Sequence, residues 1–146
     1  MLSLIDFETN VSTEGLRAQL RRAKGEMRRI PVAVNATATL TDQDVRSGYI
    51  TSTSAAATTL TLPTGTLLGA ALAATRGTIH DLYIDNTLGA SVVTVAVGVN
   101  GILSALAAAG VGAAHGLLTV PAGVTGLACF RLIFASPTAY TLTRVA

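Results

Sequence analysis

The sequence predicts a mainly β protein: an antiparallel β-sandwich or jelly-roll-like domain with a short helical arm at its N-terminus. Hydrophobic residues alternate with small polar ones in short runs after Pro31, and Gly, Pro and Asn separate the runs. No region alternates strands with long helices, as α/β proteins do. The chain also changes character at Ile30 and Pro31, from a charged segment to a body with almost no charge. We therefore divide it into an arm, residues 1–30, and a β-domain, residues 31–146.

The composition favours a protein that contacts other subunits. Hydrophobic residues make up 50% of the chain, whereas charged residues make up only 12%, about half of the usual ~25%. A length of 146 residues suits one domain with its own core. Because obligate interfaces resemble cut cores and are depleted in charge, we expect much of the exterior to lie against other subunits.

Residues 12–29 are predicted to form an amphipathic helix. Ser12 or Thr13 can cap its start, and Pro31 would stop it. Hydrophobic residues recur at helical intervals along one face. They are Leu16, Leu20, Ala23, Met27 and Ile30. We expect this stripe to pack on the β-domain or on a neighbouring subunit.

The other side of the predicted helix is basic. Six basic residues lie between positions 17 and 29, against one acid, Glu26. They are Arg17, Arg21, Arg22, Lys24, Arg28 and Arg29. Two interpretations stay open, a solvated helix face and contact with an acidic protein surface. Nucleic-acid binding is disfavoured because no aromatic residue is interleaved with the basic ones and no recognition module is present.

A short apolar segment precedes the helix. Its hydrophobic side chains lie among acids and are apolar enough to dock on a partner. They are Leu2, Leu4, Ile5 and Phe7. This N-terminus lacks a basic region followed by an apolar one, so we predict no secretion signal.

The first half of the β-domain shows a period of two. Residues 32–40 alternate as one half-buried strand, and a turn follows at 41–44. Further strands are predicted at 49–52 and 58–62. Residues 67–74 are predicted to form one or two turns of helix, because Leu, Ala and Gly lack β-branching.

The second half continues with strands and turns. We predict a strand at 78–85 and another at 91–97, joined as a hairpin. A terminal strand pair is predicted at 127–135 and 140–145. Between these lies an uncharged stretch, residues 101–118, whose glycines favour a small-residue loop or buried turn over a membrane span.

Residues that could carry chemistry are few. The histidines are His80 and His115. Along a strand, His80 points opposite to Asp81 and Asp85, so these three do not form a metal or acid–base cluster. The single Cys129 excludes an internal disulfide and is predicted to be a small buried hydrophobe. No CxxC, HExxH, GxSxG or P-loop pattern occurs, and we predict no enzyme, no cofactor and no metal.

The acidic residues of the strand at 78–85 allow two interpretations. Asp81 and Asp85 share a face with Tyr83. This face is expected either to be a solvated stripe or to meet the basic arm of another subunit.

The order of strands and turns resembles a known class of protein. The segments that carry the resemblance are TTLTLPT at 58–64, GTIHDLYIDNT at 77–87, VVTVAVG at 92–98, TVPAG at 119–123, FRLIF at 130–134 and SPTAYTL at 136–142. Over about residues 50–145 the chain is similar to the capsid decoration proteins, of the cement or head-fibre type, of tailed bacteriophages and large viruses. The small-residue insert at 105–114 departs from the resemblance, and the arm lies outside it.

The resemblance implies a virion structural protein that stabilises the capsid by non-covalent bridging of capsid subunits. Its partners would be the major capsid protein and copies of itself, as a trimer rather than a dimer. It would be made in the host cytoplasm and sit on the outer capsid surface. We expect the apolar N-terminal residues and the basic helix face to hold the capsid.

Two other functions compete with this one. A tail-fibre or tail-tip module would bind a host-surface glycan or another virion protein, but six aromatic residues and no Trp are few for stacking on sugars. A cupin-like metal enzyme would need several histidines and a carboxylate, and two histidines are too few.

Overall fold

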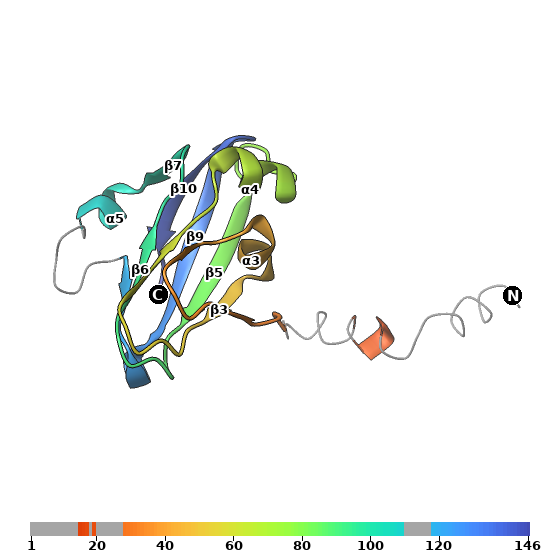
Figure 1. Ribbon diagram of the computed structural model, residues 1–146. Helices are drawn as coiled ribbons and strands as arrows, with labels where there is room; N and C mark the ends of the chain where they lie inside the picture. The colour runs from red at the N-terminus through yellow and green to blue at the C-terminus, as the bar shows by residue number, and fades with distance from the viewer. Residues whose placement is uncertain (1–14, 18, 20–27, 110–117) are drawn as a thin grey trace, which may run out of the picture.

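The computed structural model describes residues 15–17, 19, 28–109 and 118–146, which fold mostly into strands (Figure 1). The strands form two sheets, sheet A and sheet B. Sheet A has the order β1 (Val32–Ala33), β3 (Tyr49–Thr51), β5 (Ile79–Asp85), β9 (Leu127–Ser136), β10 (Ala139–Arg144) and β7 (Gly101–Leu103). Sheet B has the order β2 (Ala38–Thr39), β4 (Thr58–Thr61), β6 (Val93–Ala96) and β8 (Thr119–Val120). The prediction of a mainly β fold is confirmed.

The sheets are mixed, which differs from the antiparallel sheets that the sequence predicts. Five of the eight pairs between described strands are parallel. From β1 to β6 the chain alternates between the sheets, so that β1, β3 and β5 line up parallel in one and β2, β4 and β6 in the other. Parallel neighbours need a long crossover. Here each of these crossovers contains a strand of the facing sheet in place of a long helix, so the sequence shows no βαβ pattern.

This winding explains two wrong predictions. The sequence predicts one strand over residues 32–40, but they contain β1 of sheet A and β2 of sheet B. It also predicts that β5 and β6 pair as a hairpin, but they belong to different sheets. The terminal pair β9 and β10 is antiparallel, as predicted.

Short helices connect the strands. They are α3 (Asp42–Ser47), α4 (Gly65–Ala71), α5 (Ala105–Ala109) and the 3-10 turn η1 (Gly123–Thr125). Helix α4 confirms the helical turns predicted near residues 67–74. Helix α3 replaces a predicted turn, because Thr41 and Asp44 form a capping box in which each side chain bonds the other's backbone N–H. Within the insert at 105–114, α5 accounts for its first five residues, and 110–114 lie outside the described residues.

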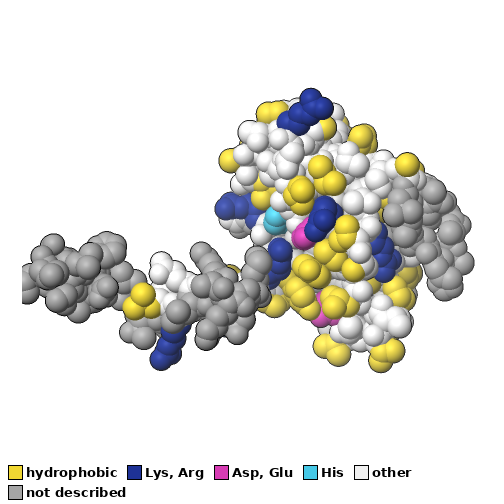
Figure 2. All heavy atoms as spheres, turned by 180° about the vertical axis from the view of Figure 1, so that it is seen from behind, with side chains coloured by type: hydrophobic (Ala, Val, Ile, Leu, Met, Phe, Trp, Pro, Cys, Tyr) yellow, Lys and Arg dark blue, Asp and Glu magenta, His cyan; other side chains and the backbone are white. Residues whose placement is uncertain are grey.

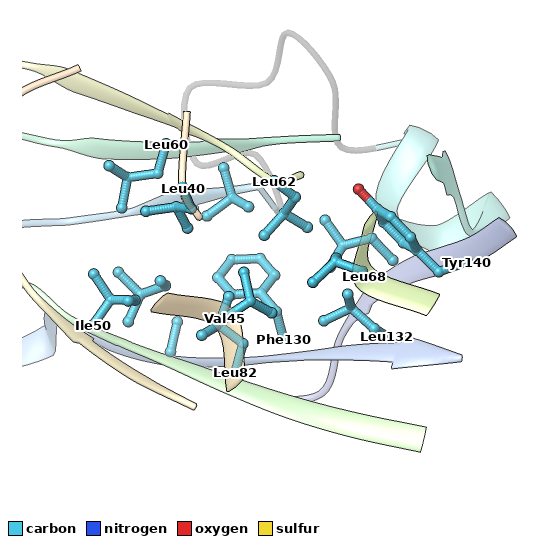
Figure 3. Close-up of a cluster of buried hydrophobic side chains, with 14 of the residues drawn as sticks. Leu40, Val45, Ile50, Leu60, Leu62, Leu68, Leu82, Phe130, Leu132 and Tyr140 are labelled. Carbon is cyan, nitrogen blue, oxygen red and sulfur yellow. The ribbon is translucent and has the colours of Figure 1, made fainter. Parts of the chain in front are cut away.

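The core lies between the two sheets and under the helices. Figure 3 shows side chains from both sheets pointing toward one another, including Leu60 of β4, Leu82 of β5 and Phe130 of β9. Val45 of α3 and Leu68 of α4 complete it, and all five are fully buried. Each such side chain contributes about 1.5–3 kcal/mol by leaving water.

A buried tyrosine ties the two sheets together. Tyr140 of β10 is fully buried. Its hydroxyl donates to the carbonyl oxygen of Pro63, 3.0 Å away, and accepts from the N–H of Gly98 at 3.2 Å. Pro63 follows β4 and Gly98 follows β6, and both strands belong to sheet B. The hydroxyl of a sheet A residue therefore bonds two backbone groups just beyond the ends of sheet B strands.

A buried asparagine joins the end of β5 to sheet B. Asn86 is fully buried, and its Nδ2 donates to the carbonyl oxygens of Ser91 at 2.8 Å, Pro121 at 3.1 Å and Val120 at 3.2 Å. Its Oδ1 has no hydrogen-bond partner among the described residues and lies where a Cβ on Gly89 would overlap it. The surroundings of Asn86 therefore offer three acceptors to its Nδ2 group, and on the side of Oδ1 they leave no room for a side chain at position 89.

Candidate functional site

The arm residues chosen from the sequence divide into those that the structure describes and those that it does not. Leu2, Leu4, Ile5, Phe7, Leu20, Arg21, Arg22, Ala23, Lys24 and Met27 lie outside the described residues. Residues 15–17 and 19 are helical, and the side chains of Leu16 and Arg17 are exposed. Arg28, Arg29 and Ile30 are predicted to continue this helix, but none of them is helical. Ile30 precedes a proline, a position that disfavours helical backbone.

Arg29 fixes the root of the arm to the β-domain. Its Nη1 donates to the backbone oxygen of Asp81 at 3.0 Å, and its guanidinium lies over the ring of Tyr83, 5.4 Å from the centroid. The guanidinium also occupies the space where a Cβ on Gly48 would be, and Gly48 itself has a left-handed φ of 72°. A residue chosen from the sequence for partner binding therefore anchors the arm to its own chain.

Arg29 lies on what we call the outer face of sheet A, the side turned away from the core. Strand register places Asp81 of β5 beside Arg131 of β9, and Ile79 beside Ile133. One step further along, Tyr83 lies between Tyr49 of β3 and Cys129 of β9. The row beyond has Asp85 beside Leu127.

An ion pair lies in the middle of this face. Nε of Arg131 donates to Oδ1 of Asp81 at 2.7 Å, and Nη2 donates to Oδ2 at 3.0 Å. This two-point hydrogen bond holds the pKa of Asp81 below its usual value and raises the pKa of Arg131. The pair stays partly accessible, with the side chains of Arg131 and Asp81 exposed by 39% and 25%.

The second carboxylate of the face is held by hydroxyl groups. Asp85 accepts from the hydroxyl of Tyr49 at 2.7 Å, and from the N–H and hydroxyl of Thr87 at 3.0 and 2.6 Å. Burial acts to raise the pKa of Asp85, but these hydrogen bonds outweigh it and the pKa is lowered. The bond to Asp85 raises the pKa of Tyr49. Within this chain, the carboxylate of Asp81 is bound by Arg131 of β9, and Arg29 of the arm root bonds the backbone oxygen of Asp81. Contact of the acidic stripe with the arm of another subunit stays a prediction.

A hollow of about 540 Å³ opens between the arm root and this face. It is lined by Arg28, Arg29, Pro31, Tyr49, Tyr83 and Leu127. The two tyrosine rings are stacked, with centroids 6.3 Å apart and planes 25° from parallel. The hollow thus combines aromatic and aliphatic walls with two guanidinium groups, which suits a ligand that is apolar and carries negative charge or hydroxyl groups.

Exposed hydrophobic side chains surround the ion pair. On the outer face, Ile79 is 57% exposed, Leu127 51% and Ile133 38%. Val145 follows β10 and is 46% exposed, and Ile102 of the edge strand β7 is 61% exposed. Figure 2 shows acidic and basic side chains in contact amid such hydrophobic ones. Large apolar groups concentrated on one face are typical of an interaction surface.

The remaining polar side chains considered in the sequence are structural. His80 points away from Asp81, as predicted, and its Nε2 lies 2.7 Å from the carbonyl oxygen of Val45. Cys129 is buried, as predicted, and burial raises the pKa of its thiol. His115 lies outside the described residues. In the described part of the chain, no group of three potential metal ligands comes together.

The sequence predicts which residues of β5 share this face but not which residues of the neighbouring strands lie beside them. It places Asp81, Tyr83 and Asp85 on one face but does not join them to Arg131, Tyr49 or Leu127. The period of two assigns a residue to a face, whereas the register between strands far apart in the chain leaves no local signal.

Comparison with known proteins adds no relative. No protein-family model matches the chain, and no curated protein or solved structure matches it. Within the described ranges, none of the helices has the length and hydrophobicity needed to span a membrane.

Proposed function

We propose that this chain is a virion structural protein that decorates the capsid and stabilises it by bridging capsid subunits without covalent bonds. Its body would be a β-sandwich of the jelly-roll-like kind. Its partners would be the major capsid protein on the outer capsid surface and further copies of itself, with a trimer as the form implied by the resemblance. Binding, not catalysis, would be its whole activity.

The observation that carries the proposal is the joint between arm and body. Arg29 holds the arm root against Tyr83, beside the exposed hydrophobic residues of the outer face of sheet A. A partner that meets this region would touch apolar surface, the hollow and the basic arm together. Apolar burial would supply most of the binding energy, at about 25 cal/mol per Å². The exposed arginines would favour an acidic surface and speed association.

The low charge of the body fits this role. Charged residues are few beyond the arm, which leaves a large exterior available for contact with subunits. Within the described ranges, the bidentate ion pair of Asp81 with Arg131 lies on the outer face itself. A partner that covers this face would therefore meet charges that are already neutralised by each other.

Co-sedimentation with capsid shells tests the proposal. Arg17 and Arg28 are exposed arm residues, so the double variant Arg17→Glu/Arg28→Glu should weaken binding by tenfold or more, which is about 1.4 kcal/mol. The matched control is Arg46→Glu/Arg76→Glu, which changes the net charge equally at exposed sites of the body. Equal loss in both variants would show a general charge effect, and no binding by the unaltered protein would reject the proposal.

A second function has one observation in its favour. The stacked pair Tyr49 and Tyr83 in the hollow offers a surface on which a sugar ring could lie, as a tail-fibre or tail-tip module would require. Immunogold labelling of virions separates the two, since a tail position favours the glycan module. Glycan binding that is lost in Tyr49→Ala would support it further.

A further inference from the structure

We propose that the outer face of sheet A is a self-association surface, on which a second copy of this chain packs face to face about a twofold axis. The inference goes beyond the capsid proposal and does not depend on it: the outer face of sheet A would be covered by a second copy, and the exposed arm residues Arg17 and Arg28 would stay available for the capsid. It concerns the contact between copies and assigns that contact to named strands. A twofold contact makes pairs of chains, in place of the trimer that the resemblance implies.

The register between β5 and β9 makes this face self-complementary. A twofold axis that lies above the face, midway between these two strands and parallel to them, would place each residue of β5 opposite its own register partner in the second copy. Ile79 would then meet Ile133 of the second copy, and Asp81 would meet Arg131 of the second copy. In these two rows, apolar side chains face apolar ones and each charge faces its opposite.

The ion pair has a donor left for a second chain. Within one copy, Arg131 uses Nε and Nη2 to bind Asp81, and its Nη1 has no partner among the described residues. In the pair of copies, two aspartates and two arginines would alternate around the axis, so Nη1 could donate to the carboxylate of the facing chain. Such a cluster has no net charge and lets the surrounding hydrophobic residues meet.

Two further charged groups lie on this face and would be covered by the contact: the guanidinium of Arg29, which lies over Tyr83 and bonds the backbone oxygen of Asp81, and the carboxylate of Asp85. Asp85 would lie opposite Leu127 of the second copy, but its carboxylate is already bonded by Tyr49 and Thr87 and needs no new partner. The exposed Ile79 and Ile133 flank the ion pair on one side and Leu127 lies on the other, so water would be excluded around the charges.

Opposite charge reversals in separate chains test this directly. Asp81→Arg puts two arginines in the register row of positions 81 and 131, and Arg131→Asp puts two aspartates there. We expect the unaltered protein to sediment as an even number of copies. Each variant alone should dissociate at least tenfold more readily, because like charges would face each other. An equimolar mixture of the two variants should associate again as mixed pairs.

The mixing experiment is decisive, because mixing cannot repair a folding defect within either chain. Thermal unfolding of each variant provides the check on folding. If either charge variant does not fold, Ile133→Lys, which keeps the ion pair, should weaken self-association, while Val124→Lys, at a fully exposed residue off this face, should not. A monomeric or trimeric unaltered protein, or a mixture that associates no better than its components, would overturn the proposal.

Discussion

Replacing Asn86 with aspartate tests how much the polar joint between β5 and sheet B contributes to the fold. The two side chains have nearly the same shape, so the substitution changes hydrogen-bonding chemistry and little else. Asn86 faces three carbonyl oxygens with Nδ2, and its Oδ1 receives no donor from the described residues. A carboxylate at this position would face three acceptors and no donor.

The expected cost follows from this geometry and depends on pH. Burial without a donor favours the protonated acid, so the pKa of the introduced carboxyl group in the folded chain rises above its unfolded value of ~3.9. Holding the proton at pH 7 costs about 4 kcal/mol. Loss of one of the two N–H donors adds about 1–2 kcal/mol at any pH. The sum approaches the whole stability of a small domain, roughly 5–15 kcal/mol.

The sign of the pH dependence is the sharpest part of the prediction. A raised folded pKa gives stability that is present below the unfolded pKa and is lost as pH rises, by about 1.4 kcal/mol per unit. Urea unfolding followed by circular dichroism between pH 4 and 7 should therefore show a deficit of Asn86→Asp that grows with pH. The control Asn86→Ala should show a deficit that does not change with pH. A deficit of Asn86→Asp that is constant or shrinks as pH rises would refute the reasoning.

Three further changes test separate contacts. Arg29→Ala should lower the free energy of unfolding by about 1 kcal/mol, because it removes a ring contact and a hydrogen bond. The neighbouring Arg28→Ala should change this free energy by less than about 0.5 kcal/mol. Equal effects of the two substitutions in urea unfolding would argue against the anchored arm root. Tyr140→Phe should cost about 1–3 kcal/mol, because two backbone groups that bond the hydroxyl lose their partner in the core; an unchanged melting curve would contradict this. Burial lowers the pKa of His80 in the folded chain, so stability should fall as pH drops below ~6.5, and His80→Gln should remove that part of the loss; a wild-type slope retained in the variant would count against it.

Much of the body can be predicted from local patterns. Alternation places Asp81, Tyr83 and Asp85 on one face of β5 and His80 on the other, and the strand pair at the C-terminus is recognisable from its two apolar runs and the turn between them. The period of two determines which way a side chain points, because successive residues of a strand alternate.

The route of the chain between the sheets cannot be predicted in the same way. The pattern in residues 32–40 continues through β1 and β2 although they lie in different sheets, because each strand has a half-buried hydrophobic residue, Val32 in β1 and Ala38 in β2, followed by an exposed residue. The absence of long helices suggests antiparallel neighbours, whereas strands of the facing sheet form the crossovers. By contrast, the capping box of Thr41 and Asp44 is present in the sequence and is a local signal for α3.

The candidate site depends on register, which no local pattern contains. Asp81 and Arg131 are separated by 50 positions, and only the pairing of β5 with β9 brings them together. The contact of Arg29 with Tyr83 likewise joins the arm to a strand far along the chain. The sequence predicts that the arm holds a partner, and the structure shows that its root holds the body of the same chain.

Electron cryomicroscopy of capsid shells, with and without the added protein, is the most direct test of the proposed function. A decoration protein should add density to the outer surface of the shell at positions related by the capsid symmetry. That density should join neighbouring capsid subunits and be lost with Arg17→Glu/Arg28→Glu. Shells that look the same with and without the protein, or density confined to the tail, would contradict capsid decoration.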